Sequence, residues 1–391
     1  MTDEIFRYDS YVFEFEAEVT NVDGDYVTLG GTAFYPGGGG QVCDTGSICG
    51  TRVTEVRYAG RDIVHRVPGN KLKAGDKVWC SVDWDRRYDL MRGHTAEHLL
   101  FNSLHRQDPD IHIVKIMISP ESKYVIVDRD VDWNRIRDAV AFANSVIYDN
   151  VPVTKSVMNR NDPDIENIRV NLDRVKEEEI TVIEIGDIDA AACSGIHVME
   201  TGEIGALFVD KKISAGKDGY AIHFRIGNDA IETSMNLANS CLQIIDELGS
   251  KPDDIIRTVV NVKNELGSAR KQLKELVVSS IRDIVPTTVN GTKLYSGTFP
   301  SIERDVLTDA AESYRKEGSV AVLLGLGDSL SVIMTSGDPR VNCKVILSES
   351  LSKFDGRGGG KADFAQGGTR DVSKAPELLE LITEKVKKSL S

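Results

Sequence analysis

Two short motifs far apart in the chain constrain it most, because both carry residues that bind transition metals. The first places His94 and His98 four positions apart, and the apolar stripe that follows them predicts a helix. On one face of a helix, two imidazoles at this spacing can reach the same ion. The second motif places Cys193 and His197 four positions apart around a glycine, which suits a tight loop.

Each motif alone has an ordinary structural interpretation. Two histidines on a helix often border a core, and a free cysteine is often a buried apolar residue. Three of the seven histidines fall in the two motifs, however, and this favours a joint site. The sequence therefore predicts one zinc ion per chain, held by His94, His98, Cys193 and His197. Such a site has four protein ligands, or three with an open position for water.

Composition limits the class of protein. The 391 residues are too many for one domain of ordinary size, and the contents of 41% hydrophobic and 28% charged residues are typical of globular proteins. No apolar run reaches the roughly twenty residues of a membrane span. The acidic start, Met1-Thr2-Asp3-Glu4, does not resemble a secretory signal. Six scattered cysteines suit a reducing compartment, so we expect a cytoplasmic protein without a membrane partner.

The net charge of −14 means that phosphates are repelled on average. The charge is uneven along the chain. Residues 1–228 hold 26 Lys and Arg against 38 Asp and Glu, whereas residues 229–391 hold 21 against 23. Indiscriminate nucleic-acid binding is therefore not expected, but the second part leaves room for a local basic patch and a specific RNA partner.

The first 85 residues carry the pattern of a small antiparallel β-barrel. Apolar and polar residues alternate over 11–19, as in a strand with one buried face. Further short apolar runs, separated by glycine-containing turns, occur at 25–29, 52–58, 62–67 and 77–83. Several short strands at close spacing are typical of a barrel.

Residues 86–228 mix helical and strand patterns and predict an α+β core around the metal motifs. Helices are predicted over 86–106 and 132–148, and strands over 112–127, 179–185, 203–209 and 220–226. The first helix would carry His94 and His98, and the strand 179–185 would lead to Cys193.

The pattern becomes purely helical over residues 229–286, with helices at 229–248 and 252–284. The second helix carries a heptad seam of apolar residues, which are Ile255, Val259, Val262, Leu266, Ala269, Leu273 and Leu276. We expect a helical hairpin, and the alternative is a seam between two chains.

Residues 287–391 predict a C-terminal α/β domain. Its strands are expected at 292–298, 319–325 and 329–335, and its helices at 302–316, 341–353 and 375–389. The fold class is therefore α+β with several domains: a barrel, a metal-containing core, a helical hairpin and an α/β domain.

Two glycine-rich stretches are ambiguous by themselves. The run Gly37 to Gly40 precedes Gln41 and lacks the Lys-Ser/Thr of a phosphate-binding P-loop. It fits a hairpin loop or a close approach to a ligand. The stretch Gly356 to Gly368 holds Arg357 and Lys361 among its glycines, and it fits a phosphate-holding loop or a structural turn.

Taken in order, these motifs resemble a known family. Phe34-Tyr35-Pro36 with the glycine run, the two metal motifs and Thr201-Gly202-Glu203-Ile204-Gly205 are similar to the editing module of alanyl-tRNA synthetases. The Gly356–Gly368 stretch is similar to their C-terminal glycine-motif domain. We expect no class II aminoacylation core before the barrel, so the chain resembles the long form of the free-standing editing proteins, AlaX.

The resemblance implies an ATP-independent hydrolase that deacylates tRNA(Ala) mischarged with serine, and with glycine, and so maintains translation fidelity. It implies that the four motif residues bind zinc. It also implies that the C-terminal region holds tRNA and supports a homodimer. The implied substrate-binding residues are Gly37, Gly38, Gly39, Gly40 and Gln41, and the implied tRNA-binding residues are Arg357, Gly358, Gly359, Gly360 and Lys361.

The chain departs from the family pattern in two places, one within the Cys193–His197 motif and one at Cys43. The synthetases usually read Cys-x-Gly-Thr-His, whereas this chain has Ser194 and Ile196, and Cys43 replaces a small residue. Neither change removes a ligand.

Hydrolysis of an aminoacyl ester needs a positioned water and a polarised carbonyl. Zinc can supply both, because it lowers the pKa of bound water to about 7. With four protein ligands it would instead fix the amino group, and Gln41 or backbone N–H groups would place the water. Glu97 is a candidate general base, and the alternative is that it is a solvated residue on the helix surface.

A synthetase pocket sized for alanine rejects serine weakly, so a second site that hydrogen-bonds the serine hydroxyl is required.

Three competing functions remain open. His94-x-x-Glu97-His98 also fits the His-x-x-Glu-His pattern of certain metallopeptidases. A non-catalytic tRNA-binding module with a structural zinc is the second alternative. The third is the editing domain of threonyl-tRNA synthetase, which shares the metal motifs but not the two glycine stretches.

Overall fold

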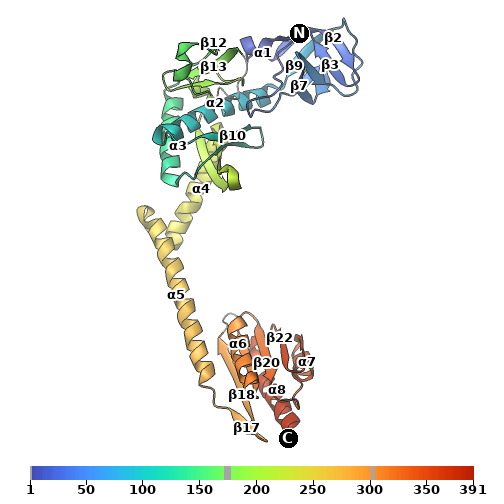
Figure 1. The fold of residues 1–391 in the computed structure, drawn as a ribbon, viewed down its shortest axis with the longest axis vertical. Helices are drawn as coiled ribbons and strands as arrows, with labels where there is room; N and C mark the ends of the chain where they lie inside the picture. The colour runs from blue at the N-terminus through green and yellow to red at the C-terminus, as the bar shows by residue number, and fades with distance from the viewer. Residues whose placement is uncertain (1, 171–177, 301–303) are drawn as a thin grey trace. The chain divides into compact units, whose positions relative to one another are not determined.

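The computed structural model describes residues 2–170, 178–300 and 304–391, and the chain forms two compact units, Met1–Ile244 and Ile245–Ser391 (Figure 1). The mixed α+β class predicted from the sequence is confirmed. The finer division into 1–85, 86–228, 229–286 and 287–391 stays a prediction. Within the described residues, no helix is long and apolar enough to span a membrane.

The first unit begins with a nearly closed β-barrel. Its sheet has the order β6-β5-β9-β2-β3-β8-β7, and the two edge strands are consecutive in the chain, so the sheet curls until its edges meet near Thr54. The strands are β2 (Glu14–Asp23), β3 (Tyr26–Leu29), β5 (Gly46–Ile48), β6 (Thr51–Val53), β7 (Glu55–Ala59), β8 (Asp62–Arg66) and β9 (Lys77–Val82). The predicted barrel is therefore confirmed, although its first long strand begins at Glu14 rather than at residue 11. A short pair, β1 (Asp3–Glu4) and β4 (Gly31–Thr32), and helix α1 (Ile5–Tyr8) lie beside it.

Helix α2 (Trp84–Gln107) is largely buried in the core of this unit. The four-stranded sheet β10-β11-β16-β15 and the helix α3 (Trp133–Tyr148) contact it, and one continuous core joins these elements to the barrel. The sheet consists of β10 (Ile113–Ile118), β11 (Lys123–Val127), β15 (Leu207–Ser214) and β16 (Tyr220–Ile226). A second sheet consists of β12 (Val153–Asn159), β13 (Glu179–Ile185) and β14 (Asp189–Ala192), of which only β13 was predicted.

The strand predicted at 203–209 is wrong in its first half. Residues Thr201–Ile204 form a short 3-10 helix, and β15 starts at Leu207. The Glu203 carboxylate causes this turn, because it accepts hydrogen bonds from the backbone N–H groups of Met199 and Glu200 and from the Tyr11 hydroxyl.

A buried ion pair fastens α2 to the barrel. Arg87 is 0% exposed and donates through Nε to both oxygens of Asp44, at 3.0 and 2.9 Å, and through Nη1 to the carbonyl of Ser10. Asp44 also accepts from the backbone N–H of Tyr35 at 2.6 Å. Because Tyr35 and Asp44 flank the glycine run, this network fixes both ends of the run relative to α2.

The second unit is a three-layer α/β/α arrangement. Its six-stranded sheet has the order β17-β18-β19-β20-β22-β21, in which only β18 and β19 run parallel. The strands are β17 (Thr287–Val289), β18 (Thr292–Pro300), β19 (Val320–Leu326), β20 (Leu330–Ser336), β21 (Arg357–Gly360) and β22 (Phe364–Thr369). The C-terminal end of α5 (Ile255–Arg282) and helix α6 (Arg304–Lys316) pack on one face, and α7 (Cys343–Leu351) and α8 (Ala375–Leu390) cover the other. The predicted strands and helices of this region are confirmed to within a few residues.

The Gly356–Gly368 stretch is neither a loop nor an isolated turn, which corrects both interpretations of the sequence. It forms the hairpin β21–β22 at the sheet edge. Two of its glycines lie close to the side chain of Leu351 in α7. A Cβ atom at Gly358 or Gly367 would stand 2.7 or 2.4 Å from its side chain.

Helix α4 (Gly227–Glu247) follows the last strand of the first unit, and α5 comes after it in the chain. Gly249 lies in the turn between the two helices, with φ at +58°. The seam predicted on α5 is largely exposed: Val259, Leu266 and Leu276 are 45%, 51% and 66% exposed. The helical hairpin therefore stays a prediction.

Candidate metal centre

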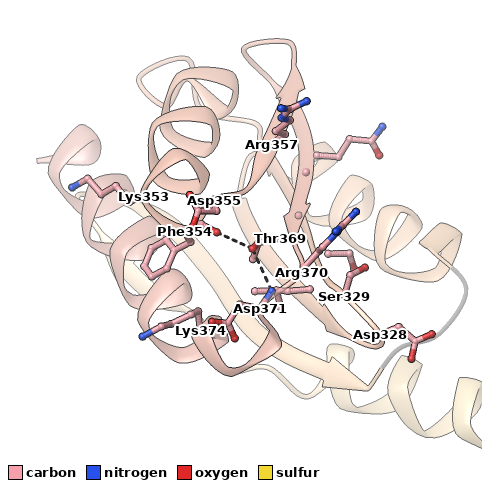
Figure 2. Close-up of a pocket in the computed structure, with 15 residues that line it drawn as sticks. Asp328, Ser329, Lys353, Phe354, Asp355, Arg357, Thr369, Arg370, Asp371 and Lys374 are labelled. Carbon is pink, nitrogen blue, oxygen red and sulfur yellow. Dashed lines mark hydrogen bonds between the residues drawn. The ribbon is translucent and has the colours of Figure 1, made fainter.

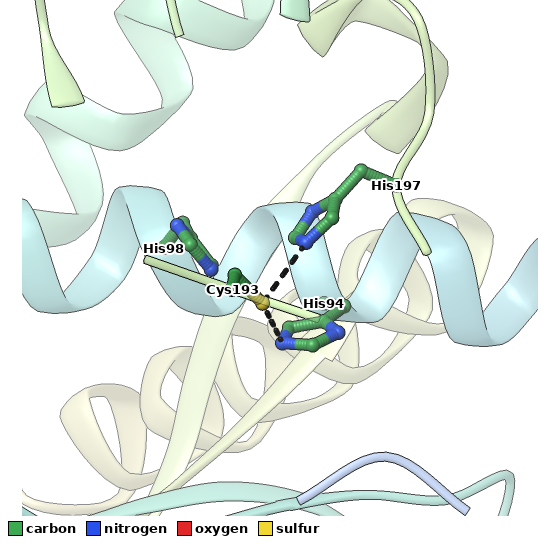
Figure 3. Close-up of side chains that lie close together, drawn as sticks. All are labelled: His94, His98, Cys193 and His197. Carbon is green, nitrogen blue, oxygen red and sulfur yellow. Dashed lines mark hydrogen bonds between the residues drawn. The ribbon is translucent and has the colours of Figure 1, made fainter. Parts of the chain in front are cut away.

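Four potential ligand atoms converge in the first unit. Those of His94, His98, Cys193 and His197 all lie within 4.8 Å of one another. Figure 3 shows the two histidines of α2 facing the segment after β14 that carries Cys193 and His197. The three imidazoles are buried, with exposures of 1%, 3% and 7%. The two motifs therefore meet in space, as their residue types predicted.

Each imidazole is oriented by an acceptor at Nδ1, and this leaves Nε2 for the cluster. His94 Nδ1 lies 2.8 Å from Gln41 Oε1, and His197 Nδ1 lies 3.1 Å from Thr95 Oγ1. The Nε2 atoms of these two histidines lie 3.5 and 3.4 Å from Cys193 Sγ. Thr95 can accept at Oγ1 because its own proton goes to the Met91 carbonyl. Metal-binding histidines are commonly held in this way.

His98 is held by a carboxylate. Its Nδ1 lies 3.0 Å from Asp189 Oδ2, which also accepts from Arg169 Nη2 at 2.9 Å, while Asn102 donates to Oδ1 at 3.1 Å. Burial opposes charge on both partners, but their hydrogen bond dominates. The pKa of His98 rises to about 10, and the pKa of Asp189 falls to about 2, with Arg169 contributing.

The Cys193 sulfur is prepared for ionisation. Burial raises the pKa of the Cys193 thiol, but its interactions with His94 and His197 outweigh burial and hold the pKa well below its usual range. The backbone N–H of Gly195 also points to Sγ at 3.4 Å. A thiolate is the form of cysteine that binds metals.

Glycine is required at position 195 for steric reasons. A Cβ atom there would stand 2.1 Å from Cε1 and 2.3 Å from Nδ1 of His94. The glycine run makes a similar close approach, because a Cβ atom at Gly40 would stand 2.7 Å from the carbonyl oxygen of Ile116. Gly40 also accepts from the N–H of Ile118 at 2.8 Å, so the run is fastened to β10 and delivers Gln41 to His94.

The cluster opens on a cavity of about 350 Å³. His94, His98 and Cys193 form one wall, together with Glu97. The other lining residues are Arg7, Gly39, Ile116, Arg169, Glu179, Ile180, Thr181, Ala192 and Ser194. Glu97 is 0% exposed, and burial raises the pKa of its carboxyl group.

The residues fit a metal ion by their chemistry. Three imidazoles with free Nε2 atoms and one thiolate are a borderline-soft ligand set with preference for zinc over magnesium or calcium. The three imidazole nitrogens and the Cys193 sulfur also bring their lone pairs close together, and a bound cation would stabilise this arrangement. The cluster can therefore hold a metal ion.

The second unit carries an open basic pocket of about 1440 Å³ (Figure 2). Its cations are Lys353, Arg357, Arg370 and Lys374, and its acids are Asp328, Asp355 and Asp371. Among the described residues, only Lys374 of these cations forms an ion pair, with Glu377. The floor is the glycine hairpin, where Thr369 donates to the Phe354 carbonyl at 2.8 Å.

Family models match three parts of the chain. Residues 6–86 match the class II (A) tRNA synthetase model, and residues 180–217 match the threonyl and alanyl tRNA synthetase second additional domain. Residues 290–388 match the DHHA1 domain.

Curated relatives match over almost the whole chain. The alanyl-tRNA editing protein AlaX-L of Pyrococcus horikoshii is 26% identical, and the match covers 100% of both chains. The chain is therefore similar from end to end to a free-standing alanyl-tRNA editing protein. The alanine–tRNA ligase of Methanoregula boonei is 31% identical over 95% of this chain, but the match spans only 42% of the ligase. A solved structure, the C-Ala domain of Aquifex aeolicus alanyl-tRNA synthetase, is 28% identical over 28% of this chain and 99% of that chain, with a TM-score of 0.25.

The structure brings some of the residues expected from this AlaX-like pattern together and separates others. Gly39 and Glu97 line the cavity, whereas Gly37, Gly38, Gly40 and Gln41 do not. Gln41 instead contacts His94.

In the second unit, Arg357 lines the basic pocket, but Gly358, Gly359, Gly360 and Lys361 do not. No sequence pattern marked Asp189, Arg169, Arg370 or Lys353 as functional residues. These residues lie in no motif, and only the fold assembles them.

Proposed function

We propose that this protein is an aminoacyl-tRNA deacylase that removes serine, and also glycine, from mischarged tRNA(Ala) in trans. One observation carries the proposal: a chain that matches an alanyl-tRNA editing protein from end to end holds a buried His/Cys cluster beside a cavity. The cavity, at about 350 Å³, suits an aminoacyl group with part of a terminal adenosine. The site of action would be the cytoplasm, where charged tRNA is used.

His94, His98, Cys193 and His197 would hold one zinc ion per chain. When bound, zinc would polarise the ester or orient the substrate amino group. Gln41 would fix the tautomer of His94 through its Oε1 atom, and Asp189 would do the same for His98.

Rejection of alanine would depend on the serine hydroxyl. Thr181 and Ser194 line the cavity and bring hydroxyl groups that can pair with it. An alanyl ester would leave these groups without a partner, and an unpaired buried polar group costs about 1–3 kcal/mol. Glycine carries no hydroxyl, so its removal would be slower than that of serine.

The basic pocket of the second unit would contact the tRNA backbone. Arg357 was expected from the sequence, and Lys353 and Arg370 join it without an ion-pair partner among the described residues. The glycines Gly358, Gly359 and Gly360 and the neighbouring Lys361 would take part through the hairpin backbone. Cations of this kind bind phosphates regardless of sequence.

A homodimer through the C-terminal region is also proposed. The exposed α5 seam supports it, because apolar residues at heptad spacing are typical of helix pairing between chains. Replacing Leu266 and Leu276 with lysine should convert a dimer to a monomer in light scattering. A monomeric unaltered protein would overturn this part of the proposal.

The alternatives make different predictions. A His-x-x-Glu-His peptidase would have no use for Cys193, and it would lose activity on casein in Glu97→Gln but not in Cys193→Ala. A non-catalytic module would bind tRNA(Ala) and leave its ester intact. A threonyl-type editing domain remains compatible with the 180–217 match, but the end-to-end match is to an alanyl-tRNA editing protein.

The decisive experiment measures release of labelled serine from Ser-tRNA(Ala), with Ala-tRNA(Ala) as the control, with and without a metal chelator. We expect fast release of serine, little release of alanine, and loss of activity in chelator that zinc restores. Serine release no faster than the uncatalysed reaction, with tRNA still bound, would favour the binding module.

A further inference from the structure

Glu97 lines the cavity as a buried carboxylate without a hydrogen-bond partner among the described residues. Its side chain is 0% exposed, and both carboxylate oxygens lack a hydrogen-bond partner among the described residues. Buried polar groups in proteins are nearly always paired, and a buried carboxylate without a donor is costly. The other buried ionisable groups of this region are paired, as Arg87 is with Asp44 and His98 with Asp189. A ligand that donates hydrogen bonds is therefore missing at Glu97.

In the described part of the chain, no side chain donates to Glu97 in place of that ligand. Glu97 stands outside the set of four converging ligand atoms, although its neighbour His98 belongs to it. His98 and Arg169 both influence the charge of Glu97, but both hydrogen-bond to Asp189. Glu97 does line the cavity, beside His94 and Cys193, so its unpaired carboxylate lies next to the space that a bound molecule would fill.

We infer that Glu97 binds the α-ammonium group of the aminoacyl ester, an inference that rests on the deacylase function proposed above. A carboxylate only accepts hydrogen bonds. The ester oxygens of the substrate also only accept, so they cannot satisfy Glu97. The ammonium group has three donors and a positive charge, and charge-assisted pairs of this kind are the strong ones.

Binding of the ammonium group and general-base catalysis differ in the substrates that they would distinguish. The ammonium group is common to seryl, glycyl and alanyl esters, so Glu97 positions each of them and does not select serine over alanine. A base would act on water and would serve any ester equally. The two roles separate when the substrate loses its amino group but keeps its size.

The test compares Ser-tRNA(Ala) with the α-hydroxy ester made from it by deamination with nitrous acid. Each rate is divided by the spontaneous rate of the same ester, because the two esters differ in reactivity. We expect the unaltered protein to favour the amino ester roughly 10- to 100-fold. Glu97→Gln, which keeps the side-chain shape, should reduce this preference to about threefold or less. Glu184→Gln, a half-buried glutamate of β13 outside the cavity, is the matched control and should keep the preference.

Two results would overturn the inference: an unaltered protein with no preference, or a Glu97→Gln variant that slows both esters by the same factor. Binding of a non-hydrolysable amide-linked seryl-adenosine and of its des-amino analogue, followed by calorimetry, separates this from the deacylase proposal. If neither ester is cleaved, the deacylase function fails, and calorimetry still decides the role of Glu97. Preference for the amino analogue that Glu97→Gln abolishes supports the role, and equal binding of both analogues refutes it. Zinc content is measured in every variant to show that the cluster is intact.

Discussion

The two units each carry one charged site, and the sites are built in opposite ways. In the first unit, four ligand atoms lie within 4.8 Å, and every imidazole has a second partner that fixes its ring. In the second unit, the basic pocket is broad and open, and most of its cations have no ion-pair partner among the described residues. The first arrangement suits precise chemistry on one small group. The second suits the loose holding of an extended polyanion.

This difference predicts how each site responds to change. A preorganised cluster should fail abruptly, because each member orients the next. A set of independent phosphate contacts should weaken in small and nearly equal steps. The following predictions test that contrast, from the largest expected effect to the smallest.

The largest effect is expected from Cys193→Ala. Loss of the only sulfur in the cluster should abolish zinc binding and lower deacylation by roughly a thousandfold or more. Metal content by mass spectrometry and serine release by the same protein batch are the two measurements. Cys241→Ala, an exposed cysteine of α4, is the control and should change neither. Full activity in a verified metal-free Cys193→Ala protein would remove the metal from the mechanism.

Gly195→Ala should come next, with a loss of roughly 100- to 1000-fold. The added methyl group would stand 2.1 Å from His94 and must displace its ring, so zinc affinity and activity should fall together. Gly267→Ala in α5 is the matched control, since a Cβ atom there meets nothing within 4 Å. The control should be neutral or slightly stabilising, because alanine favours helix. Normal zinc affinity in Gly195→Ala would mean that the cluster is less tightly preorganised than the contacts indicate.

The units should also differ in their response to acid. Burial lowers the pKa of His65 in the barrel to about 4, and all seven histidines precede residue 245. The unfolded chain binds a proton at His65 near pH 6.5 and the folded chain only near 4, so stability present above pH 6.5 is lost as the pH falls towards 4. The loss is about 3 kcal/mol in the free energy of unfolding.

Tryptophan fluorescence measures this effect selectively, because Trp79, Trp84 and Trp133 all lie in the first unit. Urea unfolding of the unaltered protein should show the pH slope, and His65→Gln should reduce this slope by the contribution of His65. Equal slopes in the two proteins would assign the acid sensitivity to other groups.

Asp189→Asn should have an intermediate effect, with zinc affinity reduced about 10- to 100-fold. The asparagine keeps the shape but loses the charge that supports the Nδ1–H of His98. Asp187→Asn, an exposed carboxylate two residues away, is the control. A competition titration with a zinc-binding dye measures the affinity, and an unchanged value in Asp189→Asn would show that His98 needs no carboxylate partner.

The smallest effect is expected in the second unit. Arg370→Ala should weaken tRNA(Ala) binding about 3- to 10-fold and reduce the salt dependence by about one phosphate contact. Cleavage of a short seryl-adenosine substrate should be unchanged. Lys344→Ala, an exposed cation of α7 outside the pocket, is the control in filter binding at several salt concentrations. Complete loss of binding from this single change would contradict the picture of independent contacts.

The sequence was informative where chemistry depends on spacing within a motif. The spacing of His94 and His98 predicted a helix, and α2 is that helix. Most barrel strands followed from alternation over 11–19 and from short apolar runs between turns, but β5 was not predicted. It was silent where function depends on residues joined only by the fold. Asp189 lies at the start of β14, with no neighbouring residue that marks it, yet it holds His98. The glycine hairpin was misread because a run of glycines is typical of a loop, whereas here most of the glycines lie against Leu351 or against neighbouring backbone atoms.

The Arg87–Asp44 pair also affects how the protein would behave when it is partly unfolded. Because Asp44 and Tyr35 hold the glycine run against α2 only while the barrel is folded, barrel and cluster should open as one cooperative unit. A molecule whose barrel has come apart would therefore lose Gln41 from His94 at the same moment. Damaged molecules would become inactive, and they would not act as unselective esterases that deacylate correctly charged tRNA.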